Sequence, residues 1–331
     1  MPGLVNKYVL LRSRLNGLPR DISWGLGLNR SYIKNSKTAR ILIYHGICHN
    51  DPLRFNMLFL KQRTFESQLR FYKKYFNIVS LDDFYNRRWD NKKSTVCITF
   101  DDGFANNYKY VLPLLQEYKI PATFFITGIR DAGYDILWND LLCLAYKYGP
   151  SKFNFRGEEF IKGGDSKYVS VSTNKRLVDT LRLNGFEGKA EMMRLLVSLK
   201  HRANEDYWLQ MTVEQIITLS ASKWVTIGSH GYYHNDLAKI PSSSTKEELL
   251  RSKQFLENST GKEIKALAFP YGSYSKEVVQ AAKNTGFSQL LATEFLFPED
   301  PADTTMRERL TINPFISNIN QMHANIAGNY K

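Results

Sequence analysis

Short apolar runs alternate with helix-like segments along much of this chain, and this alternation restricts the fold more than any other sequence feature. The runs have the length and composition of buried strands, and the segments between them carry apolar residues at helical spacing. Such alternation is typical of βαβ units, which build a parallel sheet. We expect strands within 41–45, 77–80, 96–100, 122–126, 224–228, 265–269 and 288–292. With about seven strands, we expect an α/β fold whose sheet closes into a barrel.

One long segment, 135–208, does not follow the alternation. Apolar residues with helical spacing lie towards its two ends, and polar, glycine-containing sequence lies between them. We interpret it as a mostly helical insertion near the rim that carries the candidate site. The chain then divides into a basic amphipathic N-terminal segment over 1–40, a barrel over 41–134 and 209–315, the insertion, and a C-terminal tail over 316–331.

Capping patterns mark the start of two expected helices. Thr212 and Gln215 have the spacing of a capping box. Ser244 and Glu247 have the same spacing at the start of a helix near 244–258. Each pattern places a helix before the next expected strand.

The amino-acid composition restricts the classes of partner and the cellular compartment that we expect. A net charge of +13 over 331 residues suits polyanions, anionic membrane surfaces or an acidic polymer. The sequence contains no recognisable nucleic-acid module, so we expect no nucleic-acid partner. Three cysteines without CxxC spacing indicate buried thiols in a reducing compartment. No run reaches the ~20 apolar residues of a membrane span, and no signal-peptide pattern is present, so we expect a cytoplasmic protein.

The N-terminal segment has the pattern of a basic amphipathic helix. Such a helix either packs on the domain, which we favour, or lies on a membrane surface, which would place the protein peripherally at the inner membrane face. The apolar stripe consists of Leu4, Tyr8, Leu11, Leu15 and Leu18, and the surrounding basic residues are Lys7, Arg12 and Arg14.

Two of the apolar runs end in polar residues that fit one metal site. The segment Thr99-Phe100-Asp101-Asp102-Gly103 closes one run, and a segment containing His230 and His234 closes another. Two imidazoles and one carboxylate suit zinc or a similar divalent ion. A second carboxylate beside the ligand is what metal-activated hydrolysis needs as its base.

These segments resemble the signatures of the polysaccharide deacetylase (NodB-homology) family of carbohydrate esterases. The segment with Asp101 and Asp102 resembles the first signature, His230 and His234 the second, and Phe269-Pro270-Tyr271-Gly272 the third. The resemblance covers roughly 40–315 apart from the insertion. It implies a distorted (β/α) barrel that hydrolyses N-acetyl or O-acetyl groups on sugars with a divalent metal, zinc before other transition metals.

Carried over by position, the resemblance also assigns roles to individual residues. It makes Asp101 the catalytic base and lets the backbone N–H of Tyr271 stabilise the oxyanion. It makes Asp102, His230 and His234 the metal ligands. A zinc-bound water with a pKa near ~7 would supply the nucleophile.

The sequence departs from the family pattern at two places. The arginine that precedes the third signature and orients the base is Ala268 here, and either Arg307 or Arg309 is a candidate to replace it. The C-terminal histidine signature that supplies the general acid is missing, and we interpret His323 as a surface residue. His45 ends the first strand on the same rim, so we take it as the candidate acid, with structural hydrogen bonding as an equal alternative.

The leading hypothesis is a metal-dependent hydrolase that removes an N-acetyl group from an amino sugar in a cell-surface glycan or its precursor, soluble or lipid-linked. One alternative is an O-acetyl esterase or an amidase of non-sugar substrates. Another is a catalytically inactive barrel that binds glycan. The joint presence of Asp101, Asp102, His230 and His234 argues against the inactive barrel.

Overall fold

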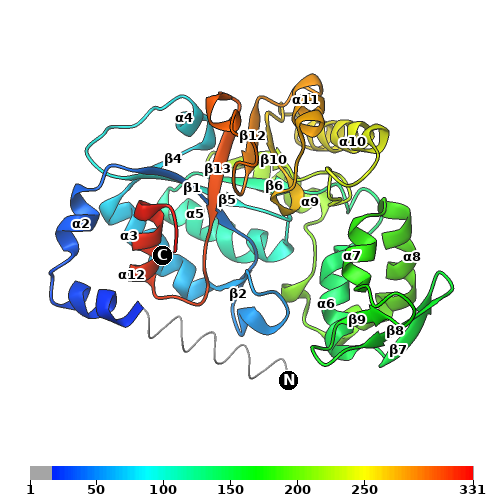
Figure 1. Ribbon diagram of the computed structural model, residues 1–331. Helices are drawn as coiled ribbons and strands as arrows, with labels where there is room; N and C mark the ends of the chain where they lie inside the picture. Colours follow the sequence, from blue (N-terminus) through cyan, green and yellow to red (C-terminus); the bar gives the residue numbers. More distant parts are fainter. Residues whose placement is uncertain (1–16, 331) are drawn as a thin grey trace.

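A computed structural model describes residues 17–330 and places a parallel barrel at the centre of the fold (Figure 1). Seven strands form a ring, which in order consists of β1 (Ala39–Tyr44), β13 (Met306–Thr311), β12 (Gln289–Ala292), β11 (Ala266–Ala268), β10 (Val225–Ser229), β6 (Ala122–Ile126) and β5 (Thr95–Phe100). The ring is closed because β5 pairs both with its neighbour β6 in the sheet order and with the first strand, β1. The register that closes the ring runs from Ala39 opposite Thr95 to Tyr44 opposite Phe100. The prediction of a seven-stranded α/β barrel is confirmed.

One of the seven strands in the barrel is not one that the sequence predicted. The run at 77–80 forms β4 (Asn77–Val79), which pairs with β5 but lies outside the ring. Its place is taken by β13, a strand that the apolar-run criterion does not detect. The reason is that Arg307, Glu308 and Arg309 occupy the middle of β13, so the strand has no apolar run.

Helices cover the outside of the barrel, and their apolar faces form the main core with the outward-facing strand residues. In α3, for example, Phe65, Leu69 and Tyr72 are buried at helical spacing. The helices are α3 (Gln62–Tyr75), α4 (Leu81–Tyr85), α5 (Leu112–Tyr118), α9 (Val213–Ala221), α10 (Ser242–Thr260) and α11 (Lys276–Asn284). A π-helix over Asn107–Val111 precedes α5, and α2 (Arg30–Asn35) precedes the barrel.

The two predicted capping boxes have different outcomes. Thr212 and Gln215 form theirs at the start of α9, with N–H to side-chain oxygen distances of 3.0 and 3.2 Å. The box at Ser244 and Glu247 is wrong, because α10 already begins at Ser242 and both residues lie inside it. Pro241 precedes that helix, and its fixed φ suits a helix start.

Residues 135–208 contain a small antiparallel sheet as well as helices, and they have an apolar core of their own. The prediction did not include the sheet, although Phe153 and Phe155 alternate with polar residues and Arg156-Gly157 makes a tight turn with positive φ. The helices are α6 (Trp138–Tyr148), α7 (Leu177–Arg182) and α8 (Phe186–Leu196), followed by 3₁₀ turns at Val197–Arg202 and Glu205–Tyr207. The strands are β7 (Lys152–Phe155), β8 (Glu158–Lys162) and β9 (Tyr168–Ser170).

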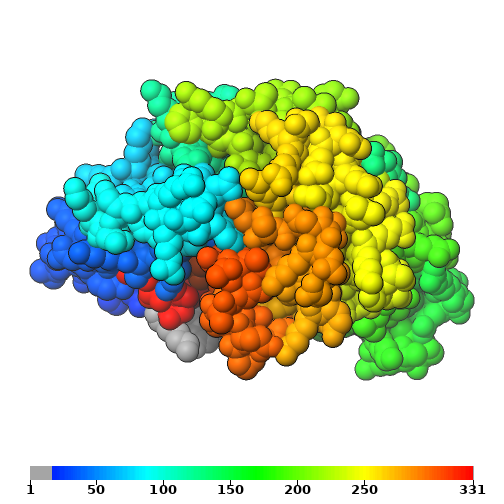
Figure 2. All heavy atoms as spheres, turned by 90° about the horizontal axis from the view of Figure 1, so that it is seen from above, coloured from blue at the N-terminus to red at the C-terminus, as the bar shows by residue number. Residues whose placement is uncertain are grey.

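The two ends of the described chain pack together on one side of the barrel. Residues 17–25 form a helix, in which Asp21 accepts hydrogen bonds from Ser317 and Asn320. Those partners belong to or cap α12 (Asn318–Ala327), so part of the expected tail is a packed helix. Figures 1 and 2 show this region at the opposite end of the molecule from the insertion.

Most of the predicted N-terminal stripe, from Leu4 to Leu15, lies outside the described residues, whereas Leu18 is described and half exposed. Within residues 17–330, no helix combines the length and apolar character that a membrane span requires.

Candidate active site

The candidate residues meet at one rim of the barrel because each follows the carboxyl end of a parallel strand. Asp101 and Asp102 follow β5, His230 and His234 follow β10, and His45 follows β1. Backbone hydrogen bonds extend the sheet into these loops, from Asp101 N–H to the Tyr44 carbonyl at 2.9 Å and from His230 N–H to the Ile126 carbonyl at 2.9 Å. In barrels of this kind the carboxyl-end rim is where active sites lie.

Asp102, His230 and His234 form a compact, buried group that could hold a metal ion. Asp102 Oδ1 lies 3.3 Å from His230 Nε2 and 3.2 Å from His234 Nε2, and the three candidate ligand atoms all fall within 4.8 Å of one another. Asp102 and His234 have positive φ values of 75° and 56°. Such strained backbone at non-glycine residues is found where the loop must aim a functional side chain.

The hydrogen bonding of His230 fits a metal ligand. Its Nδ1 lies 2.8 Å from the carbonyl oxygen of Ala268, so that nitrogen must carry a hydrogen. In the neutral ring, Nε2 then directs a lone pair at the Asp102 carboxylate, and only a proton or a cation between them makes this contact favourable. A backbone carbonyl that fixes the ring tautomer is the usual outer partner of a ligating histidine. The donor set therefore fits a divalent ion such as zinc.

Asp101 is held by a bidentate ion pair with Arg309. Arg309 Nη1 and Nη2 lie 2.7 and 2.8 Å from the two Asp101 oxygens, and both side chains are buried. Arg309 Nη1 also donates to Thr99 Oγ1 at 3.2 Å. Burial raises the pKa of Asp101, but the charge and hydrogen bonds of Arg309 and the nearby His230 together lower it by more. The pKa of this carboxyl group therefore lies below its ordinary value.

This ion pair decides which arginine replaces the one missing at Ala268. Arg307 donates to the backbone carbonyls of Thr304 and Met306 and stacks over Tyr85 at 4.7 Å, away from Asp101. Arg307 and Arg309 are two residues apart on one strand, so alternation alone does not separate them. Their positions along β13 do separate them, because Arg309 lies nearer than Arg307 to the carboxyl end of the strand and so to the rim.

His45 and Tyr271 stand beside these groups. His45 is half-buried, and its Nδ1 is buried with no partner among residues 17–330. Burial raises the pKa of Asp102, whereas His230 and His234 lower it by more, and His45 adds a smaller lowering at both Asp101 and Asp102. Tyr271 has a positive φ of 61°, and its ring centroid lies 4.6 Å from that of His234.

The insertion contacts the same loops. Trp138 Nε1 donates to the His234 carbonyl at 3.4 Å, and the Arg182 guanidinium lies 4.3 Å from the centroid of the Tyr271 ring. Lys189, which is fully buried, donates to Asn235 one residue beyond His234. The sequence analysis did not identify Trp138, Arg182 or Lys189 as residues next to the candidate site.

Other histidines and tyrosines lie elsewhere. His49 and His201 are exposed, as expected. His323 is partly exposed, and its ring stacks on that of the exposed Tyr32 at 4.9 Å. Tyr232 is buried with its hydroxyl on Asp131, and Tyr233 stacks on Phe186 at 4.2 Å.

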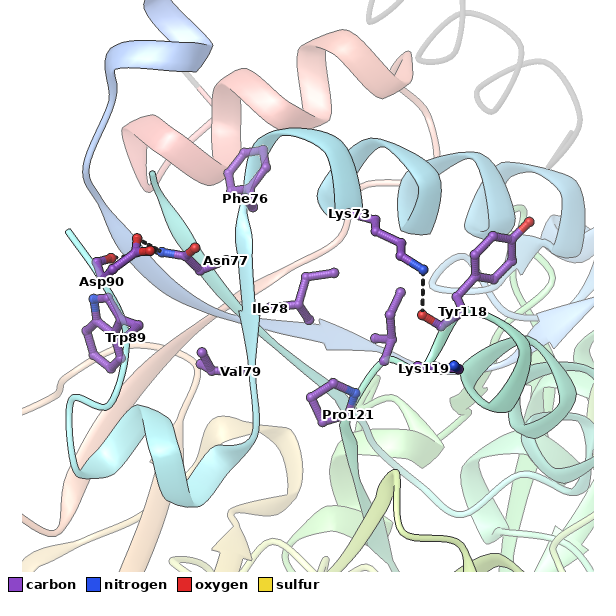
Figure 3. A pocket seen from close by; sticks show the side chains of 11 residues that line it. Lys73, Phe76, Asn77, Ile78, Val79, Trp89, Asp90, Tyr118, Lys119 and Pro121 are labelled. Atoms are coloured by element: carbon purple, nitrogen blue, oxygen red, sulfur yellow. Dashed lines mark hydrogen bonds between the residues drawn. The ribbon is translucent and has the colours of Figure 1, made fainter. Parts of the chain in front are cut away.

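A hollow of about 410 Å³ lies near the opposite end of the barrel (Figure 3). Asn77 and Pro121, which precede or begin strands, line it together with Lys73 and Trp89. Lys73 Nζ donates to the Tyr118 carbonyl at 3.0 Å, and Asn77 donates to Asp90. This hollow contains none of the candidate metal or base residues and is separate from the rim.

Comparison with known proteins identifies the family. A family model described as polysaccharide deacetylase matches residues 88–149 and 196–290, so the unmatched stretch falls inside the insertion. The chain belongs to the polysaccharide deacetylase family. Its members are hydrolases that act on acetyl groups of polysaccharides, and deacetylases of this family are metalloenzymes. The resemblance found in the sequence is thereby confirmed.

Individual relatives agree with this assignment. The chain is 22% identical over 270 residues to the "Putative polysaccharide deacetylase YxkH" of Bacillus subtilis, covering 80% of this chain and 68% of that protein. It is 38% identical over 107 residues to a poly-beta-1,6-N-acetyl-D-glucosamine N-deacetylase of Staphylococcus aureus, covering 31% of this chain and only 36% of that protein. The structure of the Streptococcus pyogenes deacetylase PplD matches with a TM-score of 0.56 at 17% identity, over 90% of this chain and 100% of that one, which supports the fold.

Proposed function

We propose that this protein is a metal-dependent N-deacetylase that acts on an acetylated amino sugar in a cell-surface glycan or its precursor. The observation that carries the proposal is the ionised Asp101, fixed by Arg309 directly beside the buried group of Asp102, His230 and His234. Hydrolysis of an amide needs an activated water, a base to take its proton and an acid to protonate the departing nitrogen. The rim offers a residue for each task.

Each residue has a defined part in the proposed reaction. Asp102, His230 and His234 would hold the ion. A divalent ion bound there would polarise the acetyl carbonyl and acidify water. Asp101 accepts the proton from the attacking water, and Arg309 keeps its two oxygens oriented for that transfer. The backbone N–H of Tyr271 stabilises the oxygen that becomes negative, a contact type worth about 3 kcal/mol.

His45 is the proposed general acid. It follows β1 on the same rim, it is close enough to both aspartates to affect their pKa values, and its Nδ1 has no protein partner in the described chain. A protonated imidazole can deliver its proton to the amine nitrogen as the C–N bond breaks.

The substrate class rests on the relatives and on the intact site. The Staphylococcus aureus relative is named as an N-deacetylase of poly-beta-1,6-N-acetyl-D-glucosamine, which favours amide over ester cleavage. An O-acetyl esterase or a non-sugar amidase would use the same groups and is the main alternative. An inactive glycan-binding barrel would have no use for the Asp101–Arg309 pair.

Mass spectrometry tests the proposal. Zinc-loaded protein is incubated with acetylated sugar nucleotides, lipid-linked sugars and N-acetylglucosamine oligomers. We expect the mass of one substrate class to fall by the difference between an acetyl group and the hydrogen that replaces it. Asp101→Asn should abolish most turnover and keep its zinc, whereas His234→Ala should lose both. Absence of turnover on every amide and ester would contradict the proposal, and zinc loss in Asp101→Asn would make Asp101 a ligand.

We further propose that the protein works at the cytoplasmic face of a membrane, where a lipid-linked substrate would be found. In the helix over 17–25, Asp21 and Trp24 face the protein, with Trp24 packed on Phe71 at 5.4 Å. The opposite face and the turn after it expose apolar side chains, which reverses the usual amphipathic arrangement. These side chains are Leu18, Ile22, Leu26 and Leu28, with exposed fractions of 49, 54, 70 and 73%.

A further inference from the structure

Asp140 is a buried carboxylic acid beside the candidate metal group that the proposed mechanism does not use. It lies in the first turn of α6, within the insertion, and only 4% of it is exposed. Asn56, from the rim segment that follows β2 (Ile47–Cys48), hydrogen-bonds its carboxyl group. The other oxygen, Oδ2, is buried and has no hydrogen-bond partner in the described part of the chain.

The first turn of α6 packs directly on the site. Trp138, two residues before Asp140, donates to the His234 carbonyl at 3.4 Å, and its ring lies 6.4 Å from that of Tyr271. Burial and then the charge of Asp102 raise the pKa of Asp140, and the charge of Asp140 in turn acts on Tyr271. Asp140 is therefore near Asp102 and Tyr271, yet it is not part of the three-residue metal group.

The stability of the fold does not explain why this carboxyl group is buried with one oxygen lacking a hydrogen-bond partner. A buried carboxyl oxygen without a partner costs free energy, and native proteins retain few such groups. The nearby cations are engaged elsewhere, since Lys189 donates to Asn235 and Arg182 stacks on Tyr271. A ligand that brings its own hydrogen-bonding groups into the site would supply the missing partner.

We propose that Asp140 is a substrate-binding residue that hydrogen-bonds a ring hydroxyl of the sugar whose acetyl group is removed. This inference rests on the proposed function and adds the insertion's contribution to it. A sugar ring has hydroxyl groups beside its acetamido group, and a buried carboxyl pairs with a hydroxyl in either protonation state. Sugar selectivity then depends on the insertion, whereas the chemistry depends on the barrel.

The test compares Asp140→Leu, which keeps the side-chain shape, with Asp140→Asn, which keeps hydrogen-bonding capacity. On an N-acetylglucosamine oligomer, we expect kcat/KM to fall about 10- to 100-fold in Asp140→Leu and less in Asp140→Asn. On 4-nitrophenyl acetate, which has no sugar hydroxyls, both variants should stay within about threefold of wild type. Zinc content should not change, and the Tm of Asp140→Leu should equal or exceed that of wild type.

Asp179→Leu is the matched control, because Asp179 is an exposed first-turn acid of α7 in the same insertion. It should leave both substrates unaffected. Equal losses of Asp140→Leu on both substrates, unchanged turnover of the oligomer, or a lower Tm would each overturn the inference.

Calorimetry with the same oligomer keeps this test separate from the proposed function. If wild type binds the oligomer without cleaving it, the proposed function fails, and a weaker affinity in Asp140→Leu still supports the role of Asp140. Equal affinity of the two proteins, or no binding by wild type, overturns it.

Discussion

At the scale of single residues, the Asp101–Arg309 pair is the feature with the most direct kinetic consequence. Removing one member of a buried ion pair costs about 3–5 kcal/mol, so Arg309→Lys, which keeps the charge, is the variant to examine. Lysine cannot hold both carboxylate oxygens, so kcat should fall about 10- to 100-fold with zinc retained.

The pH profile of that variant separates positioning from simple structural support. Arg309 lowers the pKa of Asp101 against the effect of burial, so a weaker pair raises the pKa of the base. The base must be ionised to act, and the acid limb of kcat/KM therefore moves to higher pH. Arg307→Lys, on the same strand, is the control and should change neither kcat nor the limb. If the acid limb of the pH profile did not shift in Arg309→Lys, Arg309 would not control the ionisation of the base.

His45 gives a second prediction at this scale, based on the leaving group. An amide nitrogen must be protonated as it departs, whereas the phenolate of an activated ester need not be. His45→Ala should therefore lower amide turnover by about 10²–10⁴-fold and affect 4-nitrophenyl acetate much less, with zinc content near wild type. Equal losses on the two substrates would give His45 a positioning role, and no loss on either would leave it outside the reaction.

At the scale of elements, the strands that the sequence revealed are those built mainly from apolar residues, such as β6. β13 escaped the same criterion because charged residues fill its middle, and one of them, Arg309, is buried in the ion pair with Asp101. The buried ion pair of Arg309 thus occupies a strand position where an apolar residue would have extended the pattern. The metal group was predictable because its members lie in two short motifs. Asp140 was not, since an acid in the first turn of a helix ordinarily reads as a favourable interaction with the helix dipole.

The contact between the insertion and the barrel has its own pH dependence through Lys189. This lysine of α8 is fully buried, and burial lowers its pKa from 10.5 to about 8. Between those values the unfolded chain binds a proton that the folded protein does not, so this residue's contribution to stability increases as pH rises. The unfolding free energy of wild type relative to Lys189→Met should increase by about 1–2 kcal/mol from pH 7.5 to 9.5.

Urea unfolding at several pH values measures this difference. Lys246→Met serves as the control, because Lys246 is an exposed lysine of α10 and its replacement should give parallel curves. Parallel curves for Lys189→Met as well would mean that Lys189 keeps an ordinary proton affinity in the folded protein, and that its contact with Asn235 tolerates the charge.

At the scale of the whole molecule, the helix over 17–25 and the insertion occupy opposite ends, with the barrel between them (Figures 1 and 2). The helix exposes Leu18 and Ile22, and the turn after it exposes Leu26. Lys34 and Lys37 are exposed in the segment leading to β1. An apolar face with adjacent basic residues suits a membrane that carries anionic lipids, and the net charge of +13 reinforces that attraction.

Vesicle sedimentation tests this arrangement. Wild type should bind vesicles of phosphatidylglycerol and phosphatidylcholine, and binding should weaken as salt screens the charges. The double variant Ile22→Asp with Leu26→Asp should bind about tenfold or more weakly, because two apolar side chains no longer enter the interface and two negative charges approach anionic lipid. Leu183→Asp, at an exposed leucine of the insertion, is the control and should bind like wild type.

Because the barrel is untouched, the double variant should cleave a soluble oligomer normally and a vesicle-embedded lipid-linked sugar more slowly. Undiminished vesicle binding by the double variant would remove this helix from the membrane contact.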